Sequence, residues 1–261
     1  MLKPVFVIDI GNTHIVTGVY TGNDLLFTWR VSTDKSRTED EYFTIFQQLL
    51  EQHNQPVNEF ELCVMSSVVP TLTRVFSHMI EKYFQIRLLH VTPHSAIGLR
   101  YPMPDPGHLG ADLVVNGYAA WKKYKKSCII CDFGTATTIQ LVDADGYFHG
   151  TAIMPGVVSS SKSLVENAAQ LSAIQLKKPQ GILGTTTKDA LLSGIINSHA
   201  WAVDSFIRKI RAEYSELGTI KAVATGGITP MICELIESID IVDPTLTLDG
   251  LNLIGQSGIN E

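Results

Sequence analysis

Two patterns of apolar and polar positions recur along this chain, short apolar runs and longer amphipathic stretches. The short runs predict strands over 5–8, 14–20, 25–29, 60–69, 87–91, 128–131, 139–142, 147–150 and 220–225. Apolar residues that recur every three or four positions predict helices over 38–50, 71–84, 113–121 and 190–210. Strands that alternate with helices in this way are typical of an α/β protein.

One apolar run, at 128–131, leads directly into an acid, a glycine and a group of hydroxyl side chains. The acid is Asp132, and Gly134 and Thr135 follow it. Glycine lets the backbone approach a ligand closely, and backbone N–H groups next to threonine hydroxyls can bind phosphate oxygens. Because a carboxylate repels phosphate, we expect Asp132 to act through a cation.

The same arrangement opens the chain, where the run at 5–8 precedes Asp9, Gly11 and Thr13. After each copy come an apolar run, a turn rich in Asp, Asn or Gly, and another apolar run, which indicates a hairpin. The repeat predicts two related halves that each begin with a strand and a phosphate-binding turn. Two ordinary buried strands ending in glycine turns are the alternative, although such turns do not require both an acid and a threonine.

Composition narrows the class of protein. With 261 residues, 45% of them apolar, the chain suits one large domain or two linked ones and is not expected to be disordered. Its net charge of −6 argues against a nucleic-acid-binding surface, and the basic run at 122–126 is interpreted as the solvated end of a helix. We find no signal peptide and no apolar stretch that could span a bilayer, so we expect a cytoplasmic protein without a membrane partner.

The cysteines do not indicate a metal site. Two of them form a C-x-x-C pair, but inside a strand side chains three positions apart point to opposite faces, and the chain has no second such pair. We therefore expect reduced thiols, with a metal or redox role as the alternative. The four are Cys63, Cys128, Cys131 and Cys233.

A carboxylate stands at the predicted start of the helix at 113–121. The segment 101–108 contains three prolines, which exclude a helix or a central strand, and it leads through Gly110 to Asp112. Asp112 is either an active-site carboxylate delivered by this loop or a first-turn acid that stabilises the helix dipole.

Two further glycine motifs lie in the second half. Thr187 follows Gly184 at the start of the helix predicted over 190–210, where a hydroxyl suits a polar ligand. Its alternative role is a helix N-cap. Gly226 and Gly227 follow the strand at 220–225; bare backbone there could lie against the flat ring of a nucleoside, and a simple loop is the alternative.

Taken together, these motifs resemble one kinase family. Two related halves with phosphate-binding turns resemble the actin, Hsp70 and sugar-kinase superfamily, and within it the order and spacing of the motifs resemble type III pantothenate kinase. The motifs are Asp9-Ile10-Gly11-Asn12-Thr13-His14, Leu109-Gly110-Ala111-Asp112, Asp132-Phe133-Gly134-Thr135-Ala136-Thr137-Thr138, Ile153-Met154-Pro155-Gly156, Thr187 with Ala190 and Ser193-Gly194, Thr225-Gly226-Gly227, and Asp243-Pro244-Thr245 onward.

The resemblance implies an α/β fold of two ribonuclease-H-like domains, as in a duplicated actin-like ATPase, with a nucleotide cleft between them. We place the domains at residues 1–118 and 119–261. The implied reaction is ATP-dependent phosphorylation of pantothenate to 4′-phosphopantothenate, the first step of coenzyme A biosynthesis. The implied cofactors are ATP with Mg²⁺ and a monovalent cation, K⁺ or NH₄⁺, and the implied assembly is a homodimer.

Site roles follow from the same resemblance. Asp112 would accept the hydroxyl proton as the catalytic base, Asp132 would hold the monovalent cation, and Asp9 would lie near Mg²⁺. The ATP-binding residues would be Asp9, Ile10, Gly11, Asn12, Thr13, His14, Ile15, Val16, Thr135, Gly226 and Gly227. Pantothenate would contact Tyr101, Gly110, Ala111, Asp112, Leu113 and, from the partner subunit, Thr187.

The chain departs from the family pattern in two places. Leu113 stands where the family usually has an arginine that could bind the pantothenate carboxylate, and the loop from Tyr101 to Asp112 is two residues longer than expected. A non-catalytic paralogue with a regulatory or binding role, and a kinase of the same fold acting on another small hydroxy acid, therefore remain as alternatives.

Overall fold

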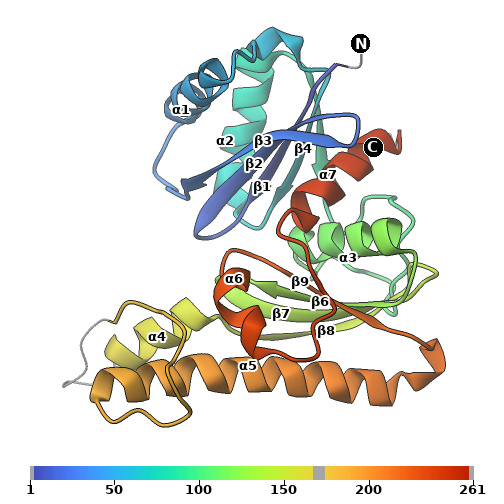
Figure 1. Ribbon diagram of the computed structural model, residues 1–261. Coiled ribbons are helices and arrows are strands. Elements are labelled where there is room, and N and C mark those ends of the chain that lie inside the picture. The colour runs from blue at the N-terminus through green and yellow to red at the C-terminus, as the bar shows by residue number, and fades with distance from the viewer. Residues whose placement is uncertain (1–2, 167–173, 259–261) are drawn as a thin grey trace. The chain divides into compact units, whose positions relative to one another are not determined.

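The computed structural model describes residues 3–166 and 174–258, and the chain divides into two compact units. One unit comprises residues 1–122 and 246–261, and the other comprises residues 123–245. This division differs from the single boundary after residue 118 that we expected. The chain passes between the units twice, because helix α7 (Leu246–Gln256) packs on strands β1 and β4 of the first unit (Figure 1).

The first unit is built on a five-stranded sheet with the strand order β3-β2-β1-β4-β5. The three strands β1, β2 and β3 form an antiparallel meander, and β4 and β5 add to it in parallel. Its elements are β1 (Val5–Ile10), β2 (His14–Thr21), β3 (Asp24–Ser32), α1 (Glu39–Gln52), η1 (Val57–Glu59), β4 (Leu62–Ser67), α2 (Pro70–Met79), the π-helical turn η2 (Ile80–Phe84), β5 (Arg87–Val91) and α3 (Ala111–Tyr124).

The second unit repeats the sheet of the first. Its strand order is β10-β9-β6-β7-β8, in which β6, β7 and β8 are the antiparallel meander and β9 and β10 are the parallel strands. The predicted duplication is therefore confirmed at the level of topology. The elements are β6 (Cys128–Phe133), β7 (Ala136–Val142), β8 (Phe148–Pro155), α4 (Val157–Glu166), α5 (Thr187–Glu213), η3 (Ser215–Leu217), β9 (Lys221–Thr225), α6 (Thr229–Ile232), η4 (Cys233–Leu235) and β10 (Ile241–Val242).

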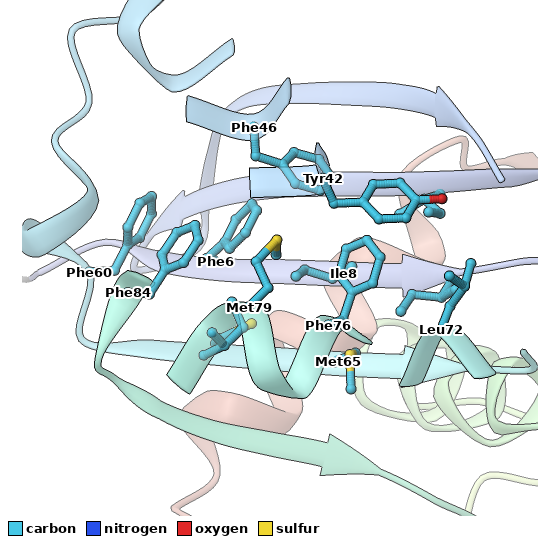
Figure 2. Close-up of a cluster of buried hydrophobic side chains, with 14 of the residues drawn as sticks. Phe6, Ile8, Tyr42, Phe46, Phe60, Met65, Leu72, Phe76, Met79 and Phe84 are labelled. Atoms are coloured by element: carbon cyan, nitrogen blue, oxygen red, sulfur yellow. The ribbon is translucent and has the colours of Figure 1, made fainter. Parts of the chain in front are cut away.

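An aromatic core joins the first sheet to helices α1 and α2 (Figure 2). Phe6 of β1 stacks on Phe84, with ring centroids 5.5 Å apart, and meets Phe46 of α1 edge-on at 6.0 Å. Helix α1 begins as its sequence predicts, since Thr38 and Glu41 form a reciprocal capping box. Burial of this apolar face supplies stability that holds the central strand β1 in place.

Helix α7 packs closely on β4 and α3 of the first unit through two glycines. A Cβ placed on Gly255 would lie 2.8 Å from a methyl group of Val64 on β4, and one on Gly250 would lie 2.8 Å from Val115 O on α3. Thr247 also donates to Asn116 Oδ1 at 2.7 Å. Only glycine permits so close an approach, so the C-terminal helix is built to dock on the first unit.

In the second unit, the long helix α5 packs across the sheet. Ile196, Val203 and Ile207 are fully buried against residues of β6 and β9. Helix α4 lies beside α5 and also contacts β7. No helix within residues 3–166 and 174–258 is long and apolar enough to cross a membrane.

Candidate active site

The first predicted phosphate-binding motif forms the turn from β1 to β2. A hydrogen bond from Gly11 N to His14 O, 3.0 Å long, closes this turn. Thr33 at the end of β3 donates from Oγ1 to Gly11 O at 2.7 Å and ties the turn to the neighbouring strand. These two hydrogen bonds fix the backbone of the turn, and the motif predicts that this turn binds a phosphate.

The side chains of this motif differ in what they can contact. Asn12, Thr13 and His14 are exposed at the turn. Ile10 and Ile15 are fully buried in the core of the first unit. These two residues can therefore meet a nucleotide only through their backbone groups.

Asp9 is oriented by a residue that the sequence analysis did not select. Ser66 Oγ donates a hydrogen bond of 2.7 Å to Asp9 Oδ1. The two residues are register partners on the parallel strands β1 and β4, and Ser66 is fully buried. The sequence shows only a hydroxyl residue near the end of an apolar run. It does not show which residue of β1 pairs with Ser66, because pairing between strands so far apart in the chain cannot be read from one sequence.

Asp112 is the second residue of α3, which begins at Ala111, before the predicted range of 113–121. Burial raises the pKa of its carboxyl group, and a hydrogen bond from Leu113 N to Oδ1, 2.8 Å long, opposes that effect. A half-buried carboxylate with a raised pKa is a stronger base than an exposed one. The dipole role considered for Asp112 does not account for its burial.

Gly110 lies directly against the Asp112 carboxylate. A Cβ atom at this position would overlap Asp112 Oδ1, and it would lie 3.7 Å from Val68 Cγ1. Val68 follows β4 and donates its N–H to Ile10 O at 3.0 Å. The turn from β4 to α2 therefore adjoins both the end of β1, which carries Asp9, and the segment that carries Asp112.

The other predicted pantothenate contacts lie deeper in the first unit. Ala111 and Leu113 are 6% and 4% exposed, so Leu113 is a core residue of α3. An arginine at position 113 would need a side-chain direction different from that of Leu113 to reach a ligand outside the core. Tyr101 is half-buried, and burial raises the pKa of its hydroxyl group to about 12.

The proline-rich loop before Asp112 is held by a carboxylate that accepts two hydrogen bonds. Asp105 Oδ1 accepts from Gly107 N at 2.8 Å and lies 2.8 Å from His94 Nε2. A Cβ on Gly107 would lie 2.9 Å from His94 Cε1, so the imidazole packs on bare backbone. His94 follows β5, and this contact anchors the proline-rich loop to the parallel side of the sheet.

The second phosphate-binding motif forms the turn from β6 to β7. Thr135 O accepts hydrogen bonds from Gly156 N at 3.1 Å and from Ser159 Oγ at 2.7 Å. A Cβ on Gly156 would lie 2.5 Å from the carbonyl oxygens of Gly134 and Thr135. The start of α4 is therefore packed tightly against this turn.

Asp132 lies against the backbone of two glycines in the second unit. A Cβ on Gly226 would lie 2.5 Å from Asp132 Oδ1, and one on Gly134 would lie 3.8 Å from the same oxygen. Gly226 has φ +97°, a conformation that glycine adopts most readily. Asp132 is the register partner of Thr225 on the parallel strand β9, as Asp9 is of Ser66.

Thr187 is the first residue of α5 and is not its N-cap. The cap is Thr186, whose Oγ1 accepts from Asp189 N at 3.1 Å. The N-cap role considered for Thr187 is therefore wrong by one residue. Thr187 lines an open groove of about 1110 Å³ between α4 and α5, together with Ser163 and His199.

The basic run is only partly the solvated helix end that we expected. Helix α3 ends at Tyr124, beyond the predicted range of 113–121, and its end lies within this run. Lys123 Nζ, however, lies 2.6 Å from Asp243 Oδ2, and that carboxylate is buried. One of the four lysines in this run thus has a structural role.

Comparison with known proteins identifies the family. The family model for type III pantothenate kinase matches residues 5–209. Proteins described as type III pantothenate kinases from an Exiguobacterium species and from Exiguobacterium sibiricum are 38% and 40% identical over 250 residues. Those alignments cover 96% of this chain and 97% and 98% of the relatives.

Solved structures agree on the fold alone. A protein described as a conserved Baf family transcriptional activator from Campylobacter jejuni matches with a TM-score of 0.60 at 17% identity, covering 97% of this chain and 98% of that one. A protein described as an N-acetylglucosamine kinase from Porphyromonas gingivalis matches with a TM-score of 0.52 at 10% identity, covering 97% and 98%. By its sequence, this chain belongs to the type III pantothenate kinase family.

Proposed function

We propose that this protein transfers the γ-phosphoryl group of ATP to the primary hydroxyl of pantothenate, with Asp112 as the base. Membership of the family supports the reaction, which begins coenzyme A biosynthesis. The observation that carries the role of Asp112 is its burial at the start of α3, which raises its pKa, together with the contact of Gly110 against its carboxylate. A cytoplasmic location is part of this proposal, because ATP is available there.

The reaction balances with a single proton acceptor. The hydroxyl oxygen of pantothenate forms a bond to the γ-phosphorus while the bond to the β,γ-bridging oxygen breaks. The hydroxyl proton passes to the Asp112 carboxylate, and ADP leaves. Phosphoryl transfer requires mainly that the reactants are positioned and that the charge of the transition state is stabilised. One oriented base and fixed backbone donors can provide both.

Each of the two phosphate-binding turns is proposed to contact phosphate groups of ATP. In the first unit the turn from Asp9 to Val16 offers backbone donors and the exposed side chains of Asn12 and Thr13. In the second unit Thr135 stands in the matching turn. Gly226 and the exposed Gly227 would meet the adenosine, because bare backbone there leaves room for a flat ring.

The proposed Mg²⁺ would be held by Asp9. Its carboxylate is half-buried and oriented by Ser66. Proteins commonly hold Mg²⁺ by one or two carboxylates together with substrate phosphates and water, so this donor fits. No group of three or more His, Cys, Asp or Glu in residues 3–166 and 174–258 could hold a metal, and a site completed by ATP phosphates needs none.

The proposed K⁺ or NH₄⁺ would be held by Asp132. Its carboxylate stands against the backbone of Gly226 and Gly134, and carboxylate, carbonyl and water oxygens are the donors that hard cations prefer. A bound cation would offset the repulsion between Asp132 and a phosphate group.

A homodimer is proposed from the family resemblance, with Thr187 contacting the pantothenate of the partner subunit. The position of Thr187 in the groove between α4 and α5 supports this role. So do large apolar side chains that are exposed on the two helices, including Leu164 at 43% and Trp201 at 53%.

A coupled assay of ADP release tests the proposal. Wild type and Asp112→Asn are compared with pantothenate and Mg²⁺-ATP, in K⁺ or in Na⁺. We expect pantothenate-dependent turnover that requires K⁺ and is almost lost in the variant. Absence of phosphopantothenate at any substrate concentration would reject the proposal.

The second candidate, a kinase of another small hydroxy acid, rests on Leu113. Its side chain is buried and has no cationic group for a substrate carboxylate. A panel of hydroxy acids in the same assay separates the two candidates, because the preferred substrate has the highest kcat/KM.

A further inference from the structure

The carboxylate of Asp9 accepts a hydrogen bond from a buried hydroxyl group. Ser66 Oγ donates to Asp9 Oδ1 over 2.7 Å, and Ser66 has no exposed surface. A hydrogen bond to an ionised acceptor is stronger than a neutral one and fixes its geometry. This bond therefore limits rotation of the carboxylate about its last side-chain torsion.

The pairing of an acid with a hydroxyl is repeated in the second sheet. In the first unit Asp9 is the register partner of Ser66 on the parallel neighbour β4. In the second unit Asp132 is the register partner of Thr225 on the parallel neighbour β9, and Thr225 is 1% exposed. The strand next to each acid thus carries a buried hydroxyl residue at the same level.

The turn that follows Ser66 is itself fixed. Ser67 Oγ accepts from Val69 N at 3.1 Å and from Thr73 Oγ1 at 2.8 Å, which closes the start of α2. Val68 N donates to Ile10 O at 3.0 Å. Ser66 is therefore part of a rigid segment rather than a mobile loop, as a positioning group must be.

We propose that Ser66 is a positioning residue that orients the Asp9 carboxylate toward the metal ion of the bound nucleotide. This inference rests on the proposed function only in taking Asp9 as the Mg²⁺ carboxylate. Groups that hydrogen-bond to a metal ligand raise metal affinity because they hold the ligand in its binding orientation. Ser66 makes that contact from β4, and the neighbouring Ser67 does not.

Binding of metal to the protein with nucleotide tests the role without turnover. Mn²⁺ in place of Mg²⁺ is titrated into protein saturated with a non-hydrolysable ATP analogue, and bound Mn²⁺ is measured by its electron paramagnetic resonance signal. We expect Ser66→Ala to weaken Mn²⁺ binding by about 10- to 100-fold, the usual effect of losing a partner of a metal ligand. Activity as a function of Mg²⁺ concentration is measured in parallel, and the Mg²⁺ concentration for half-activity should rise more than kcat falls.

Three further variants separate positioning from general stability. Ser66→Thr keeps the hydroxyl and should bind Mn²⁺ like wild type. Ser67→Ala removes the neighbouring hydroxyl and should lower the unfolding temperature without changing Mn²⁺ affinity. Ser66→Cys, which keeps the size with a weaker donor, replaces Ser66→Ala if the latter does not fold, and it should bind Mn²⁺ less tightly than wild type.

Two results would overturn the inference. One is Mn²⁺ affinity in Ser66→Ala, or in the cysteine variant, equal to that of wild type. The other is an equal loss in Ser66→Ala and Ser67→Ala, which would mean that the whole turn, not Ser66, matters. A wild-type protein that binds Mn²⁺ with nucleotide but does not phosphorylate pantothenate would reject the proposed function and leave this inference standing.

Discussion

Gly226 and Asp132 are in direct contact in the second unit: a Cβ on Gly226 would lie 2.5 Å from Asp132 Oδ1. It would also lie 2.6 Å from Phe133 N, so neither neighbour leaves space for a methyl group. Gly226, which directly follows β9, thus limits where the carboxylate of Asp132 on β6 can lie. A substitution at Gly226 should therefore disturb the proposed cation site, although Gly226 has no side chain that could bind the cation.

Gly226→Ala should weaken activation by K⁺. The added methyl group displaces the Asp132 carboxylate, and we expect the K⁺ concentration for half-activity to rise about tenfold, within the range for disturbed metal ligands. At φ +97° the alanine also costs about 1–2 kcal/mol of folding free energy. Activity is measured against K⁺ concentration, and stability by urea unfolding.

Gly218→Ala is the matched control for this variant. Gly218 has φ +70°, but a Cβ there would meet nothing within 4 Å. The control should lose similar stability and keep the K⁺ dependence of wild type. Equal K⁺ dependence in the two variants would mean that the crowding of Asp132 has no effect on the cation.

Asp112→Asn should lower kcat by about 10²- to 10⁴-fold, the usual contribution of a general base. Binding of Mg²⁺-ATP, measured by calorimetry, should not change, because Asp112 is not among the nucleotide residues. A variant that retains a tenth or more of wild-type kcat would remove Asp112 from the role of base.

The same substitution has a predicted effect on stability. Burial raises the pKa of Asp112 in the folded state, so the folded state binds its proton more tightly than the unfolded state. Stability from this group is present below the unfolded pKa and is lost as pH rises through the folded pKa. Thermal unfolding between pH 4 and pH 8 should therefore show Asp112→Asn gaining stability relative to wild type as pH rises.

Asp243→Asn should destabilise the second unit. The buried carboxylate accepts from Lys123 Nζ and from Tyr124 Oη, each at 2.6 Å. Although burial alone would raise the pKa of Asp243, these donors and the Lys123 charge leave it lowered. We expect a loss of about 1–3 kcal/mol at pH 7 by urea unfolding, the scale of hydrogen bonds to a charged group.

The pH dependence of this loss has a definite sign. Because the folded pKa of Asp243 is depressed, its stabilisation is present above the unfolded pKa and is lost as pH falls through the folded pKa. Glu234→Gln is the control, because the Glu234–Lys178 pair is exposed, with side chains 65% and 55% accessible. Glu234→Gln should cost much less stability than Asp243→Asn, because solvent screens an exposed pair. An equal loss of stability in the two variants would mean that burial of Asp243 does not matter.

Asp105→Asn should raise the KM for pantothenate with little change in the KM for ATP. Hydrogen bonds from Gly107 N and from His94 lower the pKa of Asp105 and hold the proline-rich loop. The amide accepts them less strongly, so the loop leading to Gly110 becomes less ordered. We expect a rise of about two- to fivefold, because exposed polar contacts contribute little individually. A rise confined to the KM for ATP would be inconsistent with a role of this loop in the pantothenate site.

The sequence by itself determined the duplicated α/β architecture and the positions of the main motifs. Apolar periodicity located the strands that carry Asp9 and Asp132, because burial on both faces of a sheet requires such runs. The glycine, acid and hydroxyl pattern after each strand was local and could be recognised in one sequence. The family resemblance supplied the reaction, and the comparison with known proteins confirmed it.

Only the tertiary structure decided which residues support these motifs. Ser66 on β4 donates a hydrogen bond to Asp9 on the neighbouring parallel strand β1. The Gly226 backbone, just after β9, lies against Asp132 on the neighbouring strand β6. The membership of α7 in the first unit depends on close packing by Gly250 and Gly255. Each of these contacts joins residues far apart in the chain, so it depends on strand order, register and packing, which local periodicity does not encode.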